Sequence, residues 1–223
     1  MENNFNIQEF VNYLEQFKFE LPNIYTWNPK IERLKELKVL TEEHFNRINS
    51  FEPYEKELEI KKLINEKLND TNKSDPDMFA KLCVWIIKDW GGINFSSDDK
   101  TVELVKEFIK KESPDFNRIS SFSKVASFIE PKEKVIYDAR VAYSINWIIL
   151  SKNAGEFFFP IPEGRNSTMT SFDMNVLIRL KNIALYDCDK NIDKKKLFSD
   201  ADKQLFVDKK KAYSEMNKLV KKI

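Results

Sequence analysis

Apolar residues recur every three or four positions along most of the chain, which is the spacing of a helix that buries one face. Residues 6–18 show this spacing clearly, with apolar side chains at Ile7, Phe10, Val11, Leu14 and Phe17. The same spacing predicts helices at about 31–49, 53–68, 77–90, 100–112, 121–129, 139–151, 169–185 and 200–222. Roughly nine helices joined by short links predict an all-α fold, that of a multi-helix globular protein.

Breaks in this pattern indicate how the chain is organised. The polar run NDTNKSDPD, residues 69–77, predicts a loop and is the strongest candidate for a boundary. We therefore expect an N-terminal helical region, 1–70, and a helical domain, 71–223, unless the two form one continuous domain. The helix at 77–90 is apolar around most of its circumference, so we expect it to be central and buried. The run NAGEFFFPIPEGRN, residues 153–166, predicts a loop or a short extended segment.

Composition supports the helical prediction and shows an uneven distribution of charge. Glycine is rare and strong helix formers are abundant, while 18 Phe and 4 Trp predict an aromatic core. The formal net charge is +1, which excludes a general attraction of the whole chain to nucleic acid. Residues 179–223, however, carry 13 basic and seven acidic side chains. Such a segment either contacts phosphates or forms the solvated face of a helix.

The inventory of reactive side chains is short. One histidine, His44, and two distant cysteines, Cys83 and Cys188, exclude a zinc site of the usual kind. No glycine-rich phosphate loop is present, so we expect neither a metal nor a cofactor. The cysteines are expected to be buried thiols in a reducing compartment. No signal-peptide pattern and no apolar run near the roughly 20 residues of a membrane span is visible, so we expect a cytoplasmic protein without a membrane partner.

The remaining candidate chemistry lies in residues 119–147, ISSFSKVASFIEPKEKVIYDARVAYSINW. In a purely structural interpretation, Ser120 or Ser121 caps a short helix from which Lys124 points outward. Asp138 then caps the next helix by accepting hydrogen bonds from its free N–H groups. In the alternative interpretation, Lys124 and Asp138 are the paired groups of a site.

The runs ISSFSKVASFI and VIYDARVAYSI resemble the centre of the helix-hairpin-helix DNA glycosylase superfamily, especially its 8-oxoguanine DNA glycosylase branch. In that family a tight hairpin leads into a Lys-x-Ala helix, and a V-D-x-x-V segment opens the next helix. The hairpin holds a DNA phosphate through backbone N–H groups, the lysine attacks C1′ of the sugar, and the aspartate stabilises the sugar cation or handles protons. The resemblance covers about 30 residues, and its hairpin position is RISSFS here, without the glycines of that family.

Carried over by position, the resemblance implies a glycosylase-like fold, DNA as the partner and a set of site residues. Lys124 matches the nucleophile and Asp138 the essential carboxylate, with Val125 and Ala126 on the lysine helix and Val141 as the apolar anchor of the second helix. The expected DNA contacts are Ser120, Ser121, Ser123 and Arg140, together with Arg165 at a loop tip. The expected pocket for an extruded base is built from Phe122, Tyr137, Tyr143 and Trp147.

The proposed roles agree with elementary chemistry. A lysine attacks carbon only as the neutral amine, so a nucleophilic lysine needs burial or neighbouring positive charge. An aspartate at a helix start stays ionised, which suits the stabilisation of an oxocarbenium-like sugar.

Three functions therefore stay open. The first is a DNA glycosylase or glycosylase-like lyase that excises a modified base. The second is a non-catalytic nucleic-acid-binding module on the same scaffold, which the basic C-terminal segment favours. The third is an α-helical protein that binds another protein, which the aromatic abundance and the small net charge favour.

Overall fold

The prediction of an all-α fold is confirmed. The computed structural model describes residues 4–95, 97–111, 114–163, 169, 171–186 and 193–223. In these ranges the regular elements are helices, and β-structure is limited to two isolated bridges, Phe5 with Gly155 and Phe158 with Phe206. The finer prediction of a glycosylase-like fold stays a prediction. In the same ranges no helix is both long and apolar enough to cross a bilayer.

The chain folds into two compact units. Unit 1 comprises residues 1–13, 115–117 and 137–223, and unit 2 comprises residues 14–114 and 118–136. The chain therefore passes between the units several times, and neither unit is a continuous segment. The segment that resembles the glycosylase superfamily, 119–147, is itself divided at Tyr137.

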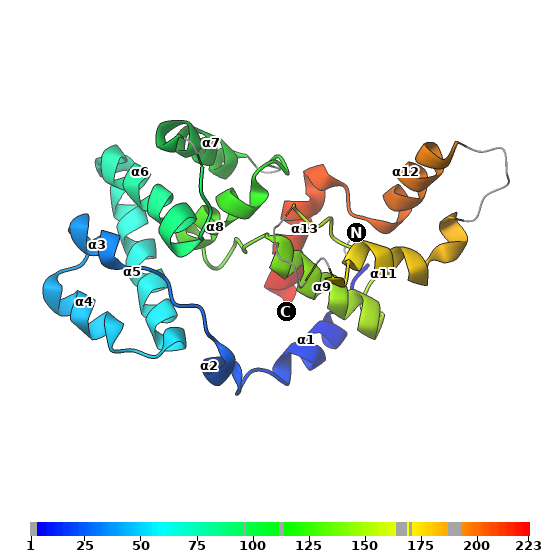
Figure 1. Ribbon diagram of the computed structural model, residues 1–223, viewed down its shortest axis with the longest axis horizontal. Helices are drawn as coiled ribbons and strands as arrows, with labels where there is room; N and C mark the ends of the chain where they lie inside the picture. The colour runs from blue at the N-terminus through cyan, green and yellow to red at the C-terminus, as the bar shows by residue number, and fades with distance from the viewer. Residues whose placement is uncertain (1–3, 96, 112–113, 164–168, 170, 187–192) are drawn as a thin grey trace. The chain divides into compact units, whose positions relative to one another are not determined.

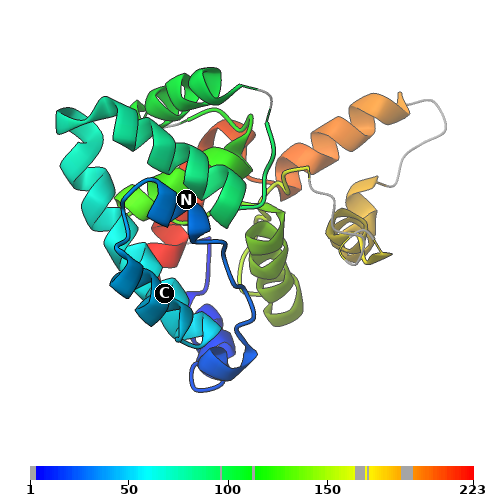
Figure 2. The same ribbon diagram turned by 60° about the vertical axis from the view of Figure 1, so that its left-hand side comes forward.

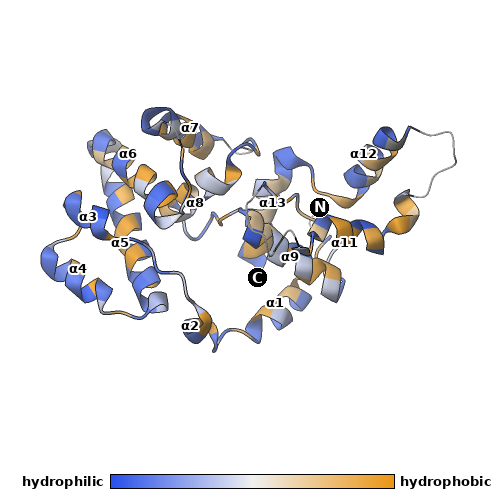
Figure 3. Ribbon diagram, viewed as in Figure 1, coloured by the Kyte–Doolittle hydropathy of each residue, from blue (hydrophilic) through white to orange (hydrophobic). Residues whose placement is uncertain are grey.

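Unit 2 contains the helix that carries Lys124. Its elements are α2 (Leu21–Ile24), α3 (Glu32–Glu36), α4 (Glu42–Asn49), α5 (Pro53–Ser74), α6 (Pro76–Trp85), the π-helical turn η1 (Ile86–Trp90), α7 (Asp98–Lys110) and α8 (Ile119–Ile129). Helices α5, α6, α7 and α8 pack on one another (Figures 1 and 2). Hydrophobic and hydrophilic residues alternate along these ribbons (Figure 3), and the apolar side chains, such as Ile60 and Ile64 of α5, are buried.

The predicted central helix is confirmed as α6 together with η1. Of its side chains, Leu82, Trp85 and Ile86 are fully buried. The helix ends where Gly91 and Gly92 follow, and Gly92 has a φ of 65°, a left-handed conformation that glycine adopts without strain.

Unit 1 contains the helix that Asp138 caps. Helix α1 (Ile7–Glu15) begins in it, and its other elements are α9 (Ala139–Lys152), α11 (Met174–Lys181), the 3₁₀ turn η2 (Ile183–Tyr186), α12 (Lys194–Leu205) and α13 (Lys209–Lys222). The predicted extended segment at 153–166 is present as far as the structure describes it. Its Phe158 N–H donates to Leu205 O, and the Val207 N–H donates to Phe158 O.

Three boundaries differ from the sequence-based prediction. The run 69–77 is not a loop, because α5 continues to Ser74 and Asp75 immediately caps α6 through the Met78 N–H. The run contains no residue that breaks a helix before Pro76, so the expected boundary near residue 70 lies within a helix. The division between the two units does not fall there either, because residues 14–114 all belong to unit 2.

The other two differences are helices that the structure divides. The predicted helix 31–49 breaks at Lys38, whose φ of 58° is left-handed, and Thr41 caps a new helix, α4. The predicted helix 200–222 becomes α12 and α13, because residues 206–207 are drawn into the bridge with Phe158 and Asp208 caps the second helix. In both places a helix-capping residue lies within the apolar pattern and begins the second helix.

The side chain of Asn146 holds the extended segment of unit 1 against α9. Asn146 is fully buried; its amide group donates to Phe159 O (2.8 Å), and its Oδ1 accepts a hydrogen bond from the Phe159 N–H (2.7 Å). One side chain therefore pairs both polar groups of a buried residue that has no strand neighbour to pair with them. Gly155 belongs to the same arrangement, since a Cβ there would lie 2.6 Å from the Phe5 ring.

Replacing Asn146 with Ala should lower the free energy of unfolding by about 2–4 kcal/mol, because it leaves a buried N–H and a buried C=O without partners. Urea unfolding followed by circular dichroism measures the change. The control is Ser144→Ala on the exposed face of the same helix, expected to change stability by less than about 0.5 kcal/mol. A loss as small as that of the control would contradict the role given to Asn146.

A second polar cluster joins α11, η2 and α12. The Arg179 guanidinium donates to both carboxylate oxygens of Asp202 (3.1 and 2.8 Å), and the Tyr186 hydroxyl donates to Asp202 Oδ1 (2.7 Å). Burial opposes ionisation of Asp202, but the hydrogen bonds from Arg179 and Tyr186 outweigh it and hold the pKa of the carboxyl below its usual value. Burial and the same carboxylate raise the pKa of Tyr186 to about 12.

The Asp202 cluster should make stability depend on pH in the acid range. A lowered carboxyl pKa in the folded state means that the stabilisation is complete above about pH 4 and is lost as the pH falls through the folded-state value. Asp202→Asn should therefore cost about 1 kcal/mol at pH 6, a figure that allows for partial exposure, and less near pH 3. The measurement is denaturant unfolding at both pH values, with the exposed Asp200→Asn as control. An equal cost at both pH values would contradict the assignment.

Candidate functional site

Helix α8 carries Lys124 in the interior of unit 2. Only 6% of the lysine is exposed, and the neighbouring Ser123 is fully buried. Lysine is almost never buried to this extent without a specific reason. The structural interpretation, in which Lys124 points outward, is therefore wrong, and the position agrees with the requirement that a nucleophilic lysine lie out of bulk water.

The side chain of Lys124 lies against the backbone that ends η1. A Cβ built on Gly91 would be 3.0 Å from Lys124 Cδ, and 2.8 and 2.9 Å from the carbonyl oxygens of Ile87 and Ile86. The Gly91 N–H donates to Ile86 O (2.8 Å), the spacing of a π-helix. A side chain at position 91 would therefore be too close both to the backbone of its own turn and to Lys124, which favours glycine there.

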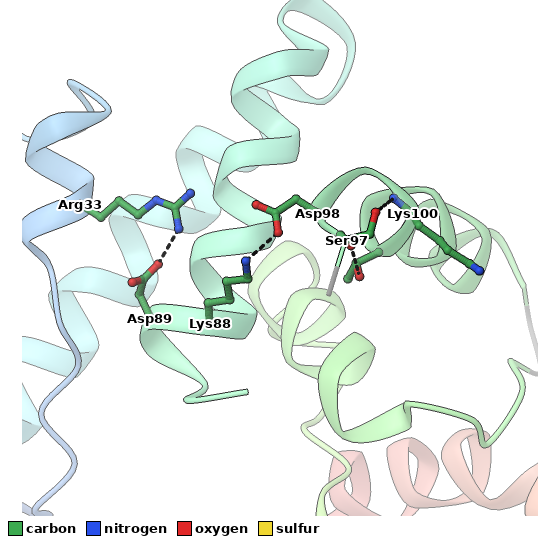
Figure 4. A network of polar contacts seen from close by, with 7 residues as sticks. Arg33, Lys88, Asp89, Ser97, Asp98 and Lys100 are labelled. Atoms are coloured by element: carbon green, nitrogen blue, oxygen red, sulfur yellow. Dashed lines mark hydrogen bonds and ion pairs between the residues drawn. The ribbon is translucent and has the colours of Figure 1, made fainter. Parts of the chain in front are cut away.

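Ion pairs fix η1 from two directions (Figure 4). Arg33 of α3 pairs with Asp89 at 3.2 Å, and Asp98 at the start of α7 pairs with Lys88 at 2.6 Å. All four side chains are partly exposed, so each pair adds little stability by itself. Their effect is to hold the turn that faces Lys124 between two neighbouring helices.

The remaining contacts of α8 fix its position. The Asn65 amide of α5 donates to Phe128 O (2.7 Å) and Ile129 O (2.9 Å), the carbonyls that the helix end leaves unpaired. Trp90 packs edge-on against Phe128 at 5.0 Å between ring centroids, and Phe108 of α7 packs likewise against Phe122 at 5.6 Å. The lysine helix is therefore held by α5, η1 and α7 together.

The three serines expected to contact DNA lie at the start of α8. Ser120 and Ser121 are half-buried in the first turn, and Ser123 is buried. The expectation that Ser120 or Ser121 caps the helix is wrong, because the N-cap is Arg118, which makes no side-chain cap hydrogen bond. Arg118 has a φ of 54°, so the left-handed conformation at this turn falls on a residue that is not glycine. A role for the serines in DNA contact stays a prediction.

Asp138 caps α9, as expected. Its Oδ1 accepts hydrogen bonds from the backbone N–H groups of Arg140 and Val141, both at 3.0 Å. Asp138 is half-buried, and the Arg140 side chain is exposed on the first turn. A carboxylate at this end of a helix is favoured in its ionised form by the helix dipole.

The four aromatic residues of the expected base pocket fall into two groups. Phe122 and Tyr137 are core residues of their respective units, and the Tyr137 hydroxyl donates to Pro160 O (2.7 Å). Tyr143 and Trp147 lie on the outer face of α9, where Trp147 is 42% exposed and the Tyr143 hydroxyl donates to Phe172 O (3.0 Å). A shared pocket of the four residues stays a prediction.

The structure assigns the two central residues to different units, Lys124 to unit 2 and Asp138 to unit 1. The pairing of Lys124 with Asp138 stays a prediction. Arg165 and Cys188 lie outside the described residues.

Cys83 is fully buried, as expected, and burial raises the pKa of its thiol to about 12. His44 is exposed. No group of three or more His, Cys, Asp or Glu that could hold a metal ion occurs among the described residues.

Sequence reasoning missed a buried carboxylate in unit 2. Glu57 of α5 is buried; it accepts two hydrogen bonds from Trp90 Nε1 (3.0 and 3.2 Å) and pairs with Lys61 at 3.4 Å. Burial, with the Glu57 carboxylate as a further cause, raises the pKa of Tyr25. The i, i+4 spacing of Glu57 and Lys61 was visible, but only the fold brings Trp90 to the pair.

Comparisons of the chain with protein-family models, with curated proteins and with solved structures find no match.

Two variants distinguish the helix cap made by Asp138 from the charge of its carboxylate. Asp138→Ala should lower the free energy of unfolding by about 1 kcal/mol, because two N–H groups lose their acceptor. Asp138→Asn should retain most of that stability, because asparagine caps a helix about as well as aspartate. Thermal or urea unfolding of both variants measures the difference, and an equal loss in the two would show that the charge rather than the cap stabilises α9.

Proposed function

We propose that this protein is a DNA glycosylase-like protein that excises a modified base, with Lys124 as the nucleophile and Asp138 as the assisting carboxylate. The observation that carries the proposal is the burial of Lys124 on α8 against Gly91. The resemblance of residues 119–147 to the glycosylase superfamily supplies the identity of the reaction and the pairing with Asp138.

The proposed reaction is a substitution at the sugar. The neutral amine of Lys124 attacks C1′, the bond between C1′ and the base nitrogen breaks, and the base leaves with the electron pair and takes up a proton. The adduct at C1′ then opens to an imine that joins the lysine to the sugar. Asp138, ionised at the start of α9, stabilises the positive charge that develops at C1′.

The burial of Lys124 meets one requirement of a chemical role, because a nucleophilic lysine must lie out of bulk water. A lysine that only packs its aliphatic stem is expected to extend its ammonium group into water. Here only 6% of the whole residue is exposed, and the opposing backbone position is a glycine that leaves space for it.

A second candidate function is a nucleic-acid-binding module without chemistry. The observation that favours it is the charge of helix α13, which carries six exposed lysines and one glutamate. Such a protein would bind DNA with a steep dependence on salt and leave every base in place.

Borohydride reduction tests the catalytic proposal directly, because it converts the imine to a stable secondary amine. The protein is incubated with duplexes that contain 8-oxoguanine, uracil, an alkylated purine or an abasic site, and the covalent adduct is measured by gel electrophoresis. We expect an adduct with at least one duplex, and none with Lys124→Met, which keeps an unbranched side chain of similar length in the buried position. The matched control is Lys110→Met on the exposed side of α7, which should leave the adduct unchanged.

Two further results complete the test. Asp138→Asn, which retains the helix cap, should slow adduct formation by about 10²–10⁴-fold if the carboxylate acts in the reaction. An adduct that persists in Lys124→Met would show that another amine is responsible. Tight DNA binding with no adduct on any duplex would favour the non-catalytic module.

A further inference from the structure

Positive charge is concentrated on the outer side of α13. The chain has a formal net charge of +1, yet this helix of 14 residues carries six lysines against one glutamate, a local charge of +5. All six lysines are exposed. The basic C-terminal segment noticed in the sequence therefore has its densest charge on this one helix.

Five of the six lysines of α13 lie on one face because of the helical spacing. The apolar residues Ala212, Tyr213, Met216 and Leu219 are buried in unit 1 and form the inner face. At 100° per residue, the opposite side carries Lys210, Lys211, Lys218, Lys221 and Lys222, which we name the lysine face. It extends over about 18 Å, because each residue of an α-helix rises about 1.5 Å.

The composition of the lysine face differs from that of a solvated helix surface in the same chain. Helix α5 carries five acidic and five basic residues, with the signs intermixed. On α13 the only acid is Glu215, which pairs with Lys218 at 3.0 Å. Lys218 and Lys222 are four residues apart, a spacing at which like charges repel, and three lysines stand in the first turn, where the helix dipole disfavours cations. The last turn also carries Lys221 and Lys222, where the dipole favours cations, so lysines occur at both ends of this helix.

The chemistry of the lysine face favours a phosphate backbone over other partners. Protein interfaces are depleted of lysine and centred on aromatic or aliphatic anchors. The lysine face carries no such aromatic or aliphatic anchor. A helix that lies on a membrane needs a free apolar side, whereas the apolar side of α13 is buried. Duplex DNA presents about ten phosphate charges over about 18 Å, enough to oppose every lysine of the face.

We propose that the lysine face of α13 contacts the phosphate backbone of duplex DNA and anchors the protein without recognising sequence. This inference rests on the proposed function, since the lysine face would supply the DNA affinity that excision of a base requires. Binding through compact ammonium charges is independent of sequence, so the face would hold any duplex equally well. Recognition of the modified base would be left to the rest of the protein.

The experiment compares two triple variants with the same change of charge. Lys211→Gln, Lys218→Gln and Lys222→Gln together remove three cations along one line of the lysine face. Lys100→Gln, Lys106→Gln and Lys110→Gln together remove three exposed cations of α7 and serve as the matched control. Binding to a fluorescent 20-base-pair duplex without a lesion is measured by anisotropy over a range of salt concentrations.

The lysine-face variant should bind at least about tenfold more weakly at low salt, and its plot of log affinity against log salt should be shallower by about two to three, since each lost phosphate contact removes about 0.9 from the slope. The α7 variant should bind within about twofold of the unchanged protein. The corresponding Lys→Arg triple variant should bind normally, because it keeps the charges. Circular dichroism verifies that every variant is folded.

Several outcomes would overturn the inference: no binding of the unchanged protein at low salt, an equal loss in both triple variants, or full binding by the lysine-face variant. Tighter binding of the lysine face to polyglutamate or to phosphatidylserine vesicles would also overturn it and indicate a protein or membrane partner. Failure of the proposed chemistry gives a different result. In that case no borohydride adduct forms on any duplex, while DNA binding still depends on the lysine face.

Discussion

The contact between Lys124 and Gly91 is the constraint on which the candidate site depends. A long, charged side chain can lie inside a packed unit only where the opposing surface gives it room, and here that surface is backbone without a Cβ. The π-helical turn η1 creates the surface, because its wider spacing brings the carbonyls of Ile86 and Ile87 close to Gly91. Any larger residue at 91 would collide with its own turn and with the lysine together.

Both units use single polar side chains to complete hydrogen bonding where regular structure ends. In unit 2, Asn65 satisfies the carbonyls at the end of α8, and in unit 1, Asn146 satisfies both backbone groups of Phe159. An all-helical chain leaves such groups wherever a helix stops or an extended segment passes through the core. These two amides therefore decide where α8 and the segment around Phe159 lie, while aromatic side chains pack around them.

The sequence predicted the structural features that depend only on residues close to one another along the chain. The apolar spacing located most helices, and the cap made by Asp138 was predicted because an N-cap needs only the residues that follow it. The continuation of α5 to Ser74 was missed because a polar run was given more weight than the absence of a helix breaker. The division at 206–207 depends on Phe158, nearly 50 residues earlier, and no local pattern contains that information. The burial of Lys124 was missed for the same reason, since it depends on Gly91.

Lys124 and the lysines of α13 lie in environments that would suit two different physical tasks. Only 6% of Lys124 is exposed, and dissolved salt screens the interactions of buried groups only weakly. The lysines of α13 lie in water, where ions compete for every phosphate contact. In the proposed protein, attachment to DNA would therefore weaken steeply with ionic strength, whereas the reaction of DNA already bound would respond little. The proposed binding surface and the proposed reactive amine, made from the same residue type, would thus be distinguishable by salt alone.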